Sequence, residues 1–146
     1  MNRADVIPSL VLSAHALARI AAQDAGNEAP SAQWRALGIL ERRGSLRLGE
    51  LAAEARTTQP GMTRLIGTLD QAGLVSRTAD PADTRATLVS ATPAGLDAIA
   101  GWRAEMRDTL APRFSELGED DWAVLHRAAE ILAVHTQQST TTGDAA

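Results

Sequence analysis

The chain has 146 residues, a formal net charge of −4, 45% hydrophobic residues and no cysteine. This length predicts one domain whose hydrophobic core needs neither a metal nor a disulfide for stability. The lack of cysteine excludes a disulfide scaffold, a thiolate metal site and a cysteine nucleophile. No signal peptide is recognisable and no unbroken apolar run reaches membrane-spanning length, so we expect a cytoplasmic protein without a membrane partner.

Charge is unevenly distributed along the chain. Residues 41–85 contain seven Arg and six acidic residues, whereas residues 86–146 contain four Arg and nine acidic residues. A net negative chain does not bind nucleic acid through bulk charge, but a few well-placed Arg side chains are enough for phosphate contacts. We therefore expect any nucleic-acid-binding surface to lie in the middle third.

The first part of the chain is predicted to be helical. Apolar residues recur every three or four positions over residues 6–23, with Pro8 in the first turn, where its missing N–H is tolerated. Gly26 marks the end of this helix. A second helix is expected from Ser31, which is a suitable N-cap, to Arg43.

Two shorter helices follow, separated by a tight turn. A third helix is expected over residues 48–55, and a fourth helix is capped by Thr57 or Thr58 and ends at Gly73. The turn between them is short enough for a helix-turn-helix, in which the second helix of the pair enters the major groove of DNA.

The hydrophobic pattern then changes from helical spacing to alternation. Residues 74–78 and 86–90 are predicted to be strands, and the segment between them is rich in turn-forming residues. Together they predict a hairpin with a long tip that presents Arg85. A short ribbon with an Arg near its tip suits the narrow, electronegative minor groove.

The last third is predicted to contain two helices and a tail. Thr92 and Pro93 are typical of an N-cap followed by the first helical residue, and Pro112 bends or ends the helix that they begin. Three acidic residues from Glu119 favour the start of a final helix, because the helix dipole is positive there. Residues 138–146 are polar and small, and we expect them to be disordered.

This order of elements predicts a mainly α protein with a small β-hairpin wing. We interpret residues 1–146 as a single domain, with a winged helix-turn-helix lobe over residues 31–92 and dimerisation helices over residues 4–24 and 93–137. The terminal helices are too apolar to stand alone, so two chains should pair through them. The residues expected in that interface are Leu10, Leu17, Leu125 and Leu132.

A set of short motifs follows the same order as the predicted lobe. The motifs are Leu51-Ala52, Met62-Thr63-Arg64-Leu65-Ile66, Leu69, Ala72-Gly73-Leu74-Val75, Arg77, Asp83-Thr84-Arg85 and Thr92-Pro93-Ala94-Gly95. Their order and spacing resemble the MarR family of bacterial transcription regulators from about residue 31 to residue 95. The sequence differs from the family at Gly67-Thr68, where a charged pair is common. It also differs in a wing that is less basic than usual, since Arg77 and Arg85 stand near Asp80 and Asp83.

The resemblance implies a homodimer that binds a pseudo-palindromic operator in double-stranded DNA, commonly as a repressor that a small aromatic or phenolic ligand releases. The candidate DNA contacts are Thr58, Gln59, Thr63, Arg64, Thr68, Arg77 and Arg85. For Arg77, a structural ion pair is an equally good alternative to a DNA contact. For Thr58, the alternative is a role as helix N-cap alone. Asp83 is expected to orient Arg85, because a carboxylate repels phosphate. Arg42, Arg43 and Arg47 either meet flanking phosphates or balance helix ends.

A ligand pocket is a further hypothesis. His15 and Arg19 are four residues apart on one helix face, and Trp34 offers an aromatic wall, so the three are candidates to hold an aromatic acid. The alternatives are a core role for Trp34 and an interface role for His15. The histidine spacing gives no metal-ligand set, so we expect no metal and no cofactor.

Catalytic motifs are not recognisable. The sequence has no Gly-rich phosphate loop, no GxSxG, no HExxH and no pairing of a nucleophile with a base. We therefore expect a protein that is not an enzyme. The alternative to a DNA-binding regulator is a dimeric protein-interaction module of the same fold that has lost operator binding, which the acidic surface favours.

Overall fold

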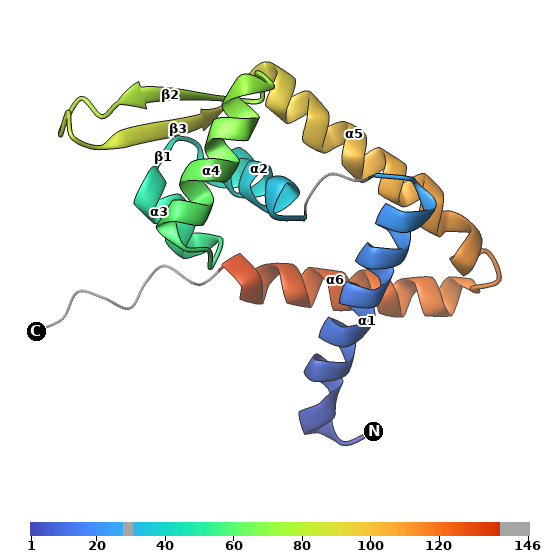
Figure 1. Cartoon of the computed structure of the whole chain (residues 1–146). Helices are drawn as coiled ribbons and strands as arrows, with labels where there is room; N and C mark the ends of the chain where they lie inside the picture. Colours follow the sequence, from blue (N-terminus) through green and yellow to red (C-terminus); the bar gives the residue numbers. More distant parts are fainter. Residues whose placement is uncertain (28–30, 138–146) are drawn as a thin grey trace, which may run out of the picture. The chain divides into compact units, whose positions relative to one another are not determined.

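The computed structural model describes residues 1–27 and 31–137, so the predicted disorder of residues 138–146 concerns residues outside the described ones. Within the described part the chain is mainly helical, with one small sheet (Figure 1). The helices are α1 (Arg3–Asp24), α2 (Ser31–Arg43), α3 (Leu48–Glu54), α4 (Gln59–Gln71), α5 (Pro93–Leu110) and α6 (Glu119–Gln137), with a 3-10 turn at Ala111–Phe114. The strands are β1 (Leu46–Arg47), β2 (Val75–Ala79) and β3 (Thr87–Ala91). The mainly α fold with a small hairpin is confirmed.

The chain divides into two compact units. The first unit ends at Leu110 and the second begins at Ala111. The hydrophobic core belongs to the first unit and is built where α2, α3, α4, α5 and the sheet meet. Its largest fully buried side chains are Leu37, Leu51, Met62, Ile66, Leu69, Val75, Val89 and Ile99. The apolar faces read from helical spacing therefore form one core.

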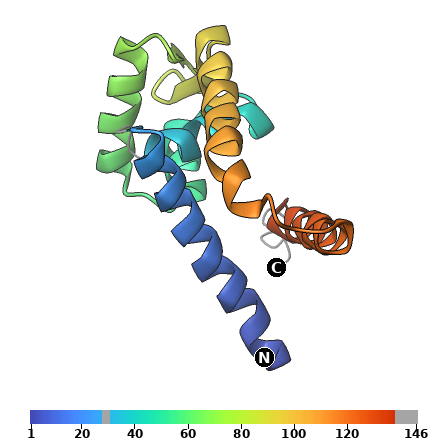
Figure 2. The same cartoon turned by 90° about the vertical axis from the view of Figure 1, so that its right-hand side faces the viewer.

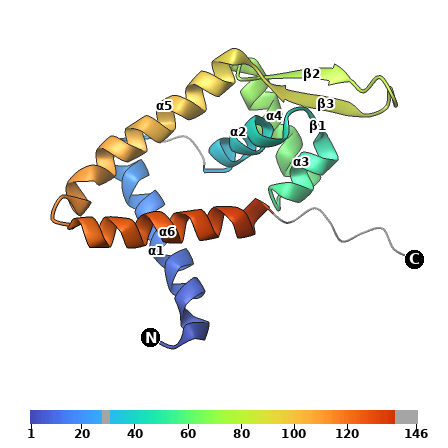
Figure 3. The same cartoon turned by 180° about the vertical axis from the view of Figure 1, so that it is seen from behind.

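The sheet is antiparallel in the order β1-β3-β2. The predicted hairpin is confirmed, with each strand one residue later than expected. It projects from the helices as a wing, which we define as β2, β3 and the loop of residues 80–86; Figure 3 shows it from behind. Strand β1 was not predicted, because two residues cannot display an alternating pattern. It lies beside β3, with Leu46 opposite Val89.

Caps and turns set the ends of the recognition helix, the name that we use for α4. Thr58 Oγ1 accepts a hydrogen bond of 3.2 Å from the Gly61 amide, which confirms the predicted N-cap. Gly73 ends the helix with a φ of 75°, a left-handed conformation that favours glycine. The Thr92 hydroxyl then donates to the Gly73 carbonyl and accepts from the Gly95 amide, so one side chain ties the start of α5 to the end of α4.

Helix α1 begins earlier than predicted, and it is more apolar than the sequence interpretation recognised. It begins at Arg3, capped by Asn2, so Pro8 lies in the second turn rather than the first and leaves the Ala4 carbonyl without its usual helical donor. Figure 2 shows its N-terminal half extending beyond α2–α5. An 18-residue window of α1 has a mean hydropathy of 1.3, long and apolar enough by composition to cross a membrane. The sequence interpretation counted only unbroken apolar runs and missed this property.

Two glycines give opposite expectations for the free energy of unfolding. A Cβ on Gly95 would lie 2.0 Å from the Leu74 carbonyl oxygen, whereas a Cβ on Gly67 would meet nothing within 4 Å. We expect Gly95→Ala to destabilise the fold by about 3 kcal/mol through this clash with backbone. Gly67→Ala should stabilise it by about 0.5–1 kcal/mol, because glycine is a poor helix former.

Urea unfolding of both variants at one fixed chain concentration measures these changes. Equal stabilities for Gly95→Ala and the parent protein would contradict the close packing of α5 against the segment between α4 and β2.

Candidate nucleic-acid interface

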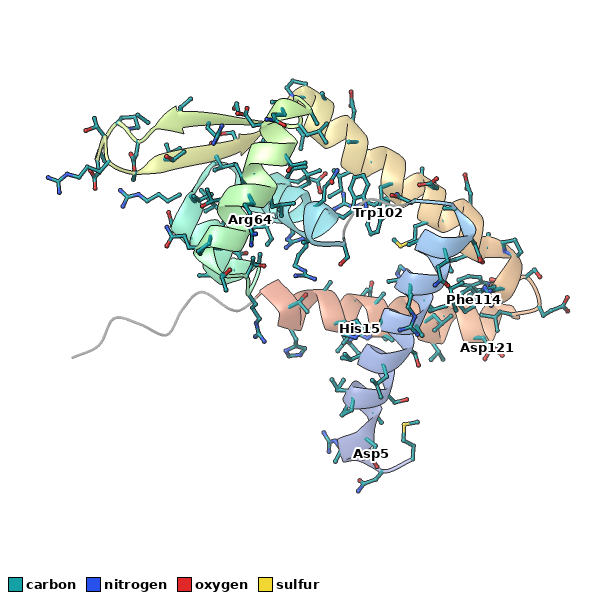
Figure 4. The ribbon with its side chains drawn as sticks, in the orientation of Figure 1. Asp5, His15, Arg64, Trp102, Phe114 and Asp121 are labelled. Atoms are coloured by element: carbon teal, nitrogen blue, oxygen red, sulfur yellow. The ribbon has the colours of Figure 1, made fainter. Side chains whose placement is uncertain are left out.

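The recognition helix has one buried face and one exposed face. Met62, Ile66 and Leu69 point into the core, and the predicted contacts Gln59, Thr63, Arg64 and Thr68 are all exposed. Figure 4 labels Arg64 on this helix. Within the described residues, the Arg64 side chain has no hydrogen-bond or ion-pair partner. Its five N–H donors are therefore free to bind an external acceptor.

Most neutral candidates on this helix are partly engaged by the backbone. The Thr63 hydroxyl donates to the Gln59 carbonyl at 2.9 Å, and the Thr68 hydroxyl donates to the Arg64 carbonyl at 3.2 Å. Both oxygens keep lone pairs, and a hydroxyl can rotate toward a new acceptor. Thr58 acts as the N-cap, which agrees with the simpler of the two roles considered for it.

The second charged residue of the recognition helix is Asp70, and it is paired. Its Oδ2 accepts hydrogen bonds from Nε and Nη2 of Arg77 on β2, at 3.1 and 2.8 Å. Both side chains are over a third exposed, so the pair contributes little to overall stability. It joins the wing to α4 and neutralises a carboxylate that would repel phosphate. The structural alternative for Arg77 is therefore realised in the free chain.

The wing loop is organised around Asp80, which is only 7% exposed. Its Oδ1 accepts from the Ala82 amide at 2.9 Å, and its Oδ2 accepts from Arg47 Nε at 2.7 Å. The Ala82 amide, followed by Arg47, lowers the pKa of Asp80 below its usual value despite partial desolvation. The carboxylate thus stays ionised at neutral pH, and the stability that it provides is present above its ordinary pKa and lost on strong acidification.

Asp83 and Arg85 lie in the same loop but do not form a side-chain ion pair. Asp83 Oδ1 accepts a 3.1 Å hydrogen bond from the backbone amide of Arg85. The Arg85 side chain is exposed and, in the part of the chain that the structure describes, has no partner. Asp83 therefore contacts the backbone that carries Arg85 and leaves its guanidinium free.

A hollow of about 310 Å³ lies between the start of α3 and the wing, next to the first residue of the recognition helix. It is lined by Arg47, Leu48, Gly49, Glu50, Gln59, Arg85, Ala86 and Thr87. The fold thus brings two predicted contacts, Gln59 and Arg85, to one recess together with Arg47. The other two basic residues considered for flanking contacts are in α2: Arg43 pairs with Glu54 at 3.4 Å, and Arg42 is exposed.

The sequence interpretation missed three features of this region. Asp80 was counted as part of the turn-rich tip and as a charge that made the wing less basic, but not as the partner of Arg47. Asp70 was not considered as a partner for Arg77. Arg56, in the turn between α3 and α4, has a φ of 51°, a left-handed conformation that costs a non-glycine residue about 1 kcal/mol and has no sequence signal here.

The three candidate ligand residues differ in burial: Trp34 packs against the core, whereas His15 and Arg19 are exposed. Trp34 stacks on Trp102 of α5, with ring centroids 5.3 Å apart and planes 13° apart, and packs against the core. His15 and Arg19 are exposed on α1. Figure 4 labels His15 and Trp102 on their two helices. The hollow beside the wing is lined by none of the three.

Comparison with known proteins agrees with this geometry. The model of the MarR family matches residues 30–86, which cover the helix-turn-helix and most of the wing. The chain is 32% identical over 107 residues to the uncharacterized HTH-type transcriptional regulator Mb0904 of Mycobacterium bovis, covering 73% of this chain and 75% of that protein. It is 28% identical over 100 residues to the HTH-type transcriptional repressor IacR of Pseudomonas putida, covering 68% and 60% of the two chains.

A solved structure extends the match to the terminal helices. A MarR family protein from Bacillus stearothermophilus superposes with a TM-score of 0.74 at 21% identity, covering 94% of this chain and 99% of that one, which shows a shared fold. The molecule is a transcriptional regulator with a winged-helix DNA-binding fold. It belongs to the MarR family, as the sequence motifs indicated.

Proposed function

We propose that this protein binds a pseudo-palindromic operator as a homodimer and represses transcription until a small ligand releases it. The observation that carries the proposal is the distribution of charge on the DNA-binding face. Two acids of this region, Asp70 and Asp80, are each held by an Arg. Arg64 and Arg85 remain exposed and unpaired among the described residues. A net negative chain thereby offers local positive charge to phosphate.

The proposed roles follow from where each side chain lies. Arg64 enters the major groove with the recognition helix, and Arg85 reaches the flanking minor groove from the wing. Asp83 orients the loop that carries Arg85. The remaining contacts, to phosphates or base edges, are assigned to Thr58, Gln59, Thr63, Thr68 and Arg77.

Repression, cytoplasmic location and the lack of enzymatic activity are parts of the same proposal. Repressor function is supported by the similarity to IacR, which is a transcriptional repressor. Operator DNA is cytoplasmic in bacteria, and regulators of this family act by binding it rather than by catalysis. The alternative, an interaction module that has lost operator binding, is less favoured, because an interaction module has no need for two free Arg side chains on the helix and wing.

Dimerisation is supported by the exposed apolar surface of the terminal helices. None of the α6 side chains that the structure describes is buried. Apart from Met1 and Leu96, the exposed large hydrophobic residues of the described chain lie on α1 or α6: Val6, Ile7, Val11, Leu12, Trp122, Val124, Leu125, Ile131 and Val134. Such surface is unusual in a monomer. We assign it to a second copy, with Leu10, Leu17, Leu125 and Leu132 in the interface.

Ligand release requires a site that differs between two arrangements of the dimer. We propose that His15, Arg19 and Trp34 belong to it, with Arg19 available for a carboxylate and the Trp34–Trp102 stack as an aromatic wall. A ligand that binds one spacing of the two recognition helices better than the other, about 34 Å apart on DNA, weakens operator binding.

The first experiment tests the DNA contacts. We expect Arg85→Ala to weaken binding to all duplexes and to reduce the salt slope by about one phosphate contact per chain. Arg64→Ala should cost about 1–3 kcal/mol and relax specificity at one base pair of each half-site. Gel shifts at several salt concentrations measure both effects, with duplexes selected from a random pool by the parent protein.

The matched control is Arg107→Ala, which removes the same charge from an exposed position on α5. It should leave the salt slope unchanged. Binding that ignores both Arg64→Ala and Arg85→Ala would favour the interaction module.

The second experiment tests the dimer. Placing a charge on the apolar side of α6 with Leu125→Asp should weaken association at least about tenfold, because a buried unpaired carboxylate is costly. Sedimentation velocity at micromolar concentration measures the change. His126→Asp puts the same charge on an exposed, polar position of α6 and should leave the dimer intact. A parent protein that sediments as a monomer would contradict the proposal.

The third experiment tests ligand release. In a thermal-shift screen of phenolic acids, a ligand at about 100 times its Kd should stabilise the protein by roughly 2.7 kcal/mol. The same compound should release DNA in the gel shift, and Arg19→Ala should reduce both effects. A compound that stabilises the protein without releasing DNA would argue against ligand control of this operator.

A further inference from the structure

The wing loop is connected to the rest of its unit by one polar contact. Inside the loop, the Asp80 amide donates to the Ala86 carbonyl at 3.0 Å, and the Asp83 amide donates to the Asp80 carbonyl at 3.2 Å. Among the described residues, the one hydrogen bond or ion pair that joins residues 80–86 to an element outside the hairpin is that of Asp80 with Arg47. Beyond the two strands that carry it, the loop is therefore held in place relative to the recognition helix by this pair.

Arg47 is well placed to act as the fixed end of the contact. Its backbone is in β1, opposite Leu88 of β3, and it is also the N-cap residue of α3. The Arg47 amide donates to Glu50 Oε1 at 3.2 Å, so the Glu50 side chain holds the Arg47 backbone at the start of α3. Helix α3 packs directly against α4. The Arg47 backbone is thus held by the same core that holds the recognition helix.

A continuous series of hydrogen bonds leads from Arg47 to Arg85. The Arg47 guanidinium binds the Asp80 carboxylate, the Asp80 carbonyl accepts from the Asp83 amide, and the Asp83 carboxylate accepts from the Arg85 amide. At the end of this series the Arg85 side chain lines the same hollow as Arg47 and Gln59. An ordered loop needs less ordering when DNA binds, which favours affinity.

We propose that the Arg47–Asp80 pair is a positioning device that holds the wing loop so that Arg85 and the recognition helix engage DNA together. The inference rests on the proposed DNA contact of Arg85. It assigns to Asp80 a role opposite to that of an ordinary acid near DNA. By charge alone, removing Asp80 would strengthen binding to phosphate, whereas loss of positioning weakens it.

The sign of this effect is the test. We expect Asp80→Asn to weaken binding to the selected duplex about five- to twentyfold, and to change it less than about twofold when Arg85 is already Ala, because the two residues then act through one contact. Asp97→Asn removes the same charge from an exposed position on α5 and should leave binding unchanged or slightly tighter. Asp80→Glu keeps the charge and should restore part of the affinity.

A second readout reports the loop itself. The chain has no cysteine, so Thr84→Cys in the exposed tip can carry a single fluorophore. Asp80→Asn and Arg47→Gln should both lower the fluorescence anisotropy of this label in the absence of DNA, with little change in the melting temperature. The Arg47 variant serves as the test if the Asp80 variant does not fold.

The outcomes separate the two proposals. If Arg85→Ala itself leaves DNA binding unchanged, the proposed wing contact is wrong. If Arg85→Ala weakens binding but Asp80→Asn strengthens it, or weakens it equally in the Arg85→Ala background, the positioning role is wrong and the wing contact stands. Unchanged anisotropy in the Arg47 and Asp80 variants would also overturn the positioning role.

Discussion

The DNA-binding face depends on which charges the fold leaves unpaired. A chain with a net charge of −4 repels a polyanion at long range, so association requires local positive charge. The fold supplies it by pairing acids internally: Arg77 holds Asp70 beside the recognition helix, and Arg47 holds Asp80 at the base of the wing. Each pair also links two elements, so the contacts that neutralise the face are the contacts that fix its geometry.

Close backbone packing joins this face to α5. Glycine at position 95 allows α5 to approach the Leu74 carbonyl, and the Thr92 side chain binds both the end of α4 and the start of α5. The short segment Gly73-Leu74 therefore connects the recognition helix to the wing and also contacts the start of α5. Displacement of α5 would act directly on the DNA-binding lobe, as the proposed release by a ligand requires.

The fold was predictable because its signals are local. Helical spacing, the caps at Thr58 and Thr92, and the change to alternation at residue 74 all depend on neighbouring residues. The features that were missed depend on residues distant in sequence. Strand β1 exists only because β3 lies beside it, and the role of Asp80 exists only because Arg47, 33 residues earlier, reaches its carboxylate. The residues of β1 and Asp80 could be read from the sequence, but the distant residues that they contact could not.

The sparse charge of the recognition helix also explains why the terminal helices matter to function. With Asp70 neutralised and a glycine at position 67, Arg64 is the one unpaired charge on α4, whose other exposed candidates are neutral donors. Neutral donors discriminate between bases but contribute little non-specific affinity. One half-site therefore provides specificity with modest strength. In the proposed homodimer, joining two such faces through apolar helices would make the second binding event intramolecular, which would raise affinity without adding charge. Dimerisation through the exposed apolar surface of α1 and α6 would thus compensate for the low charge of each recognition helix.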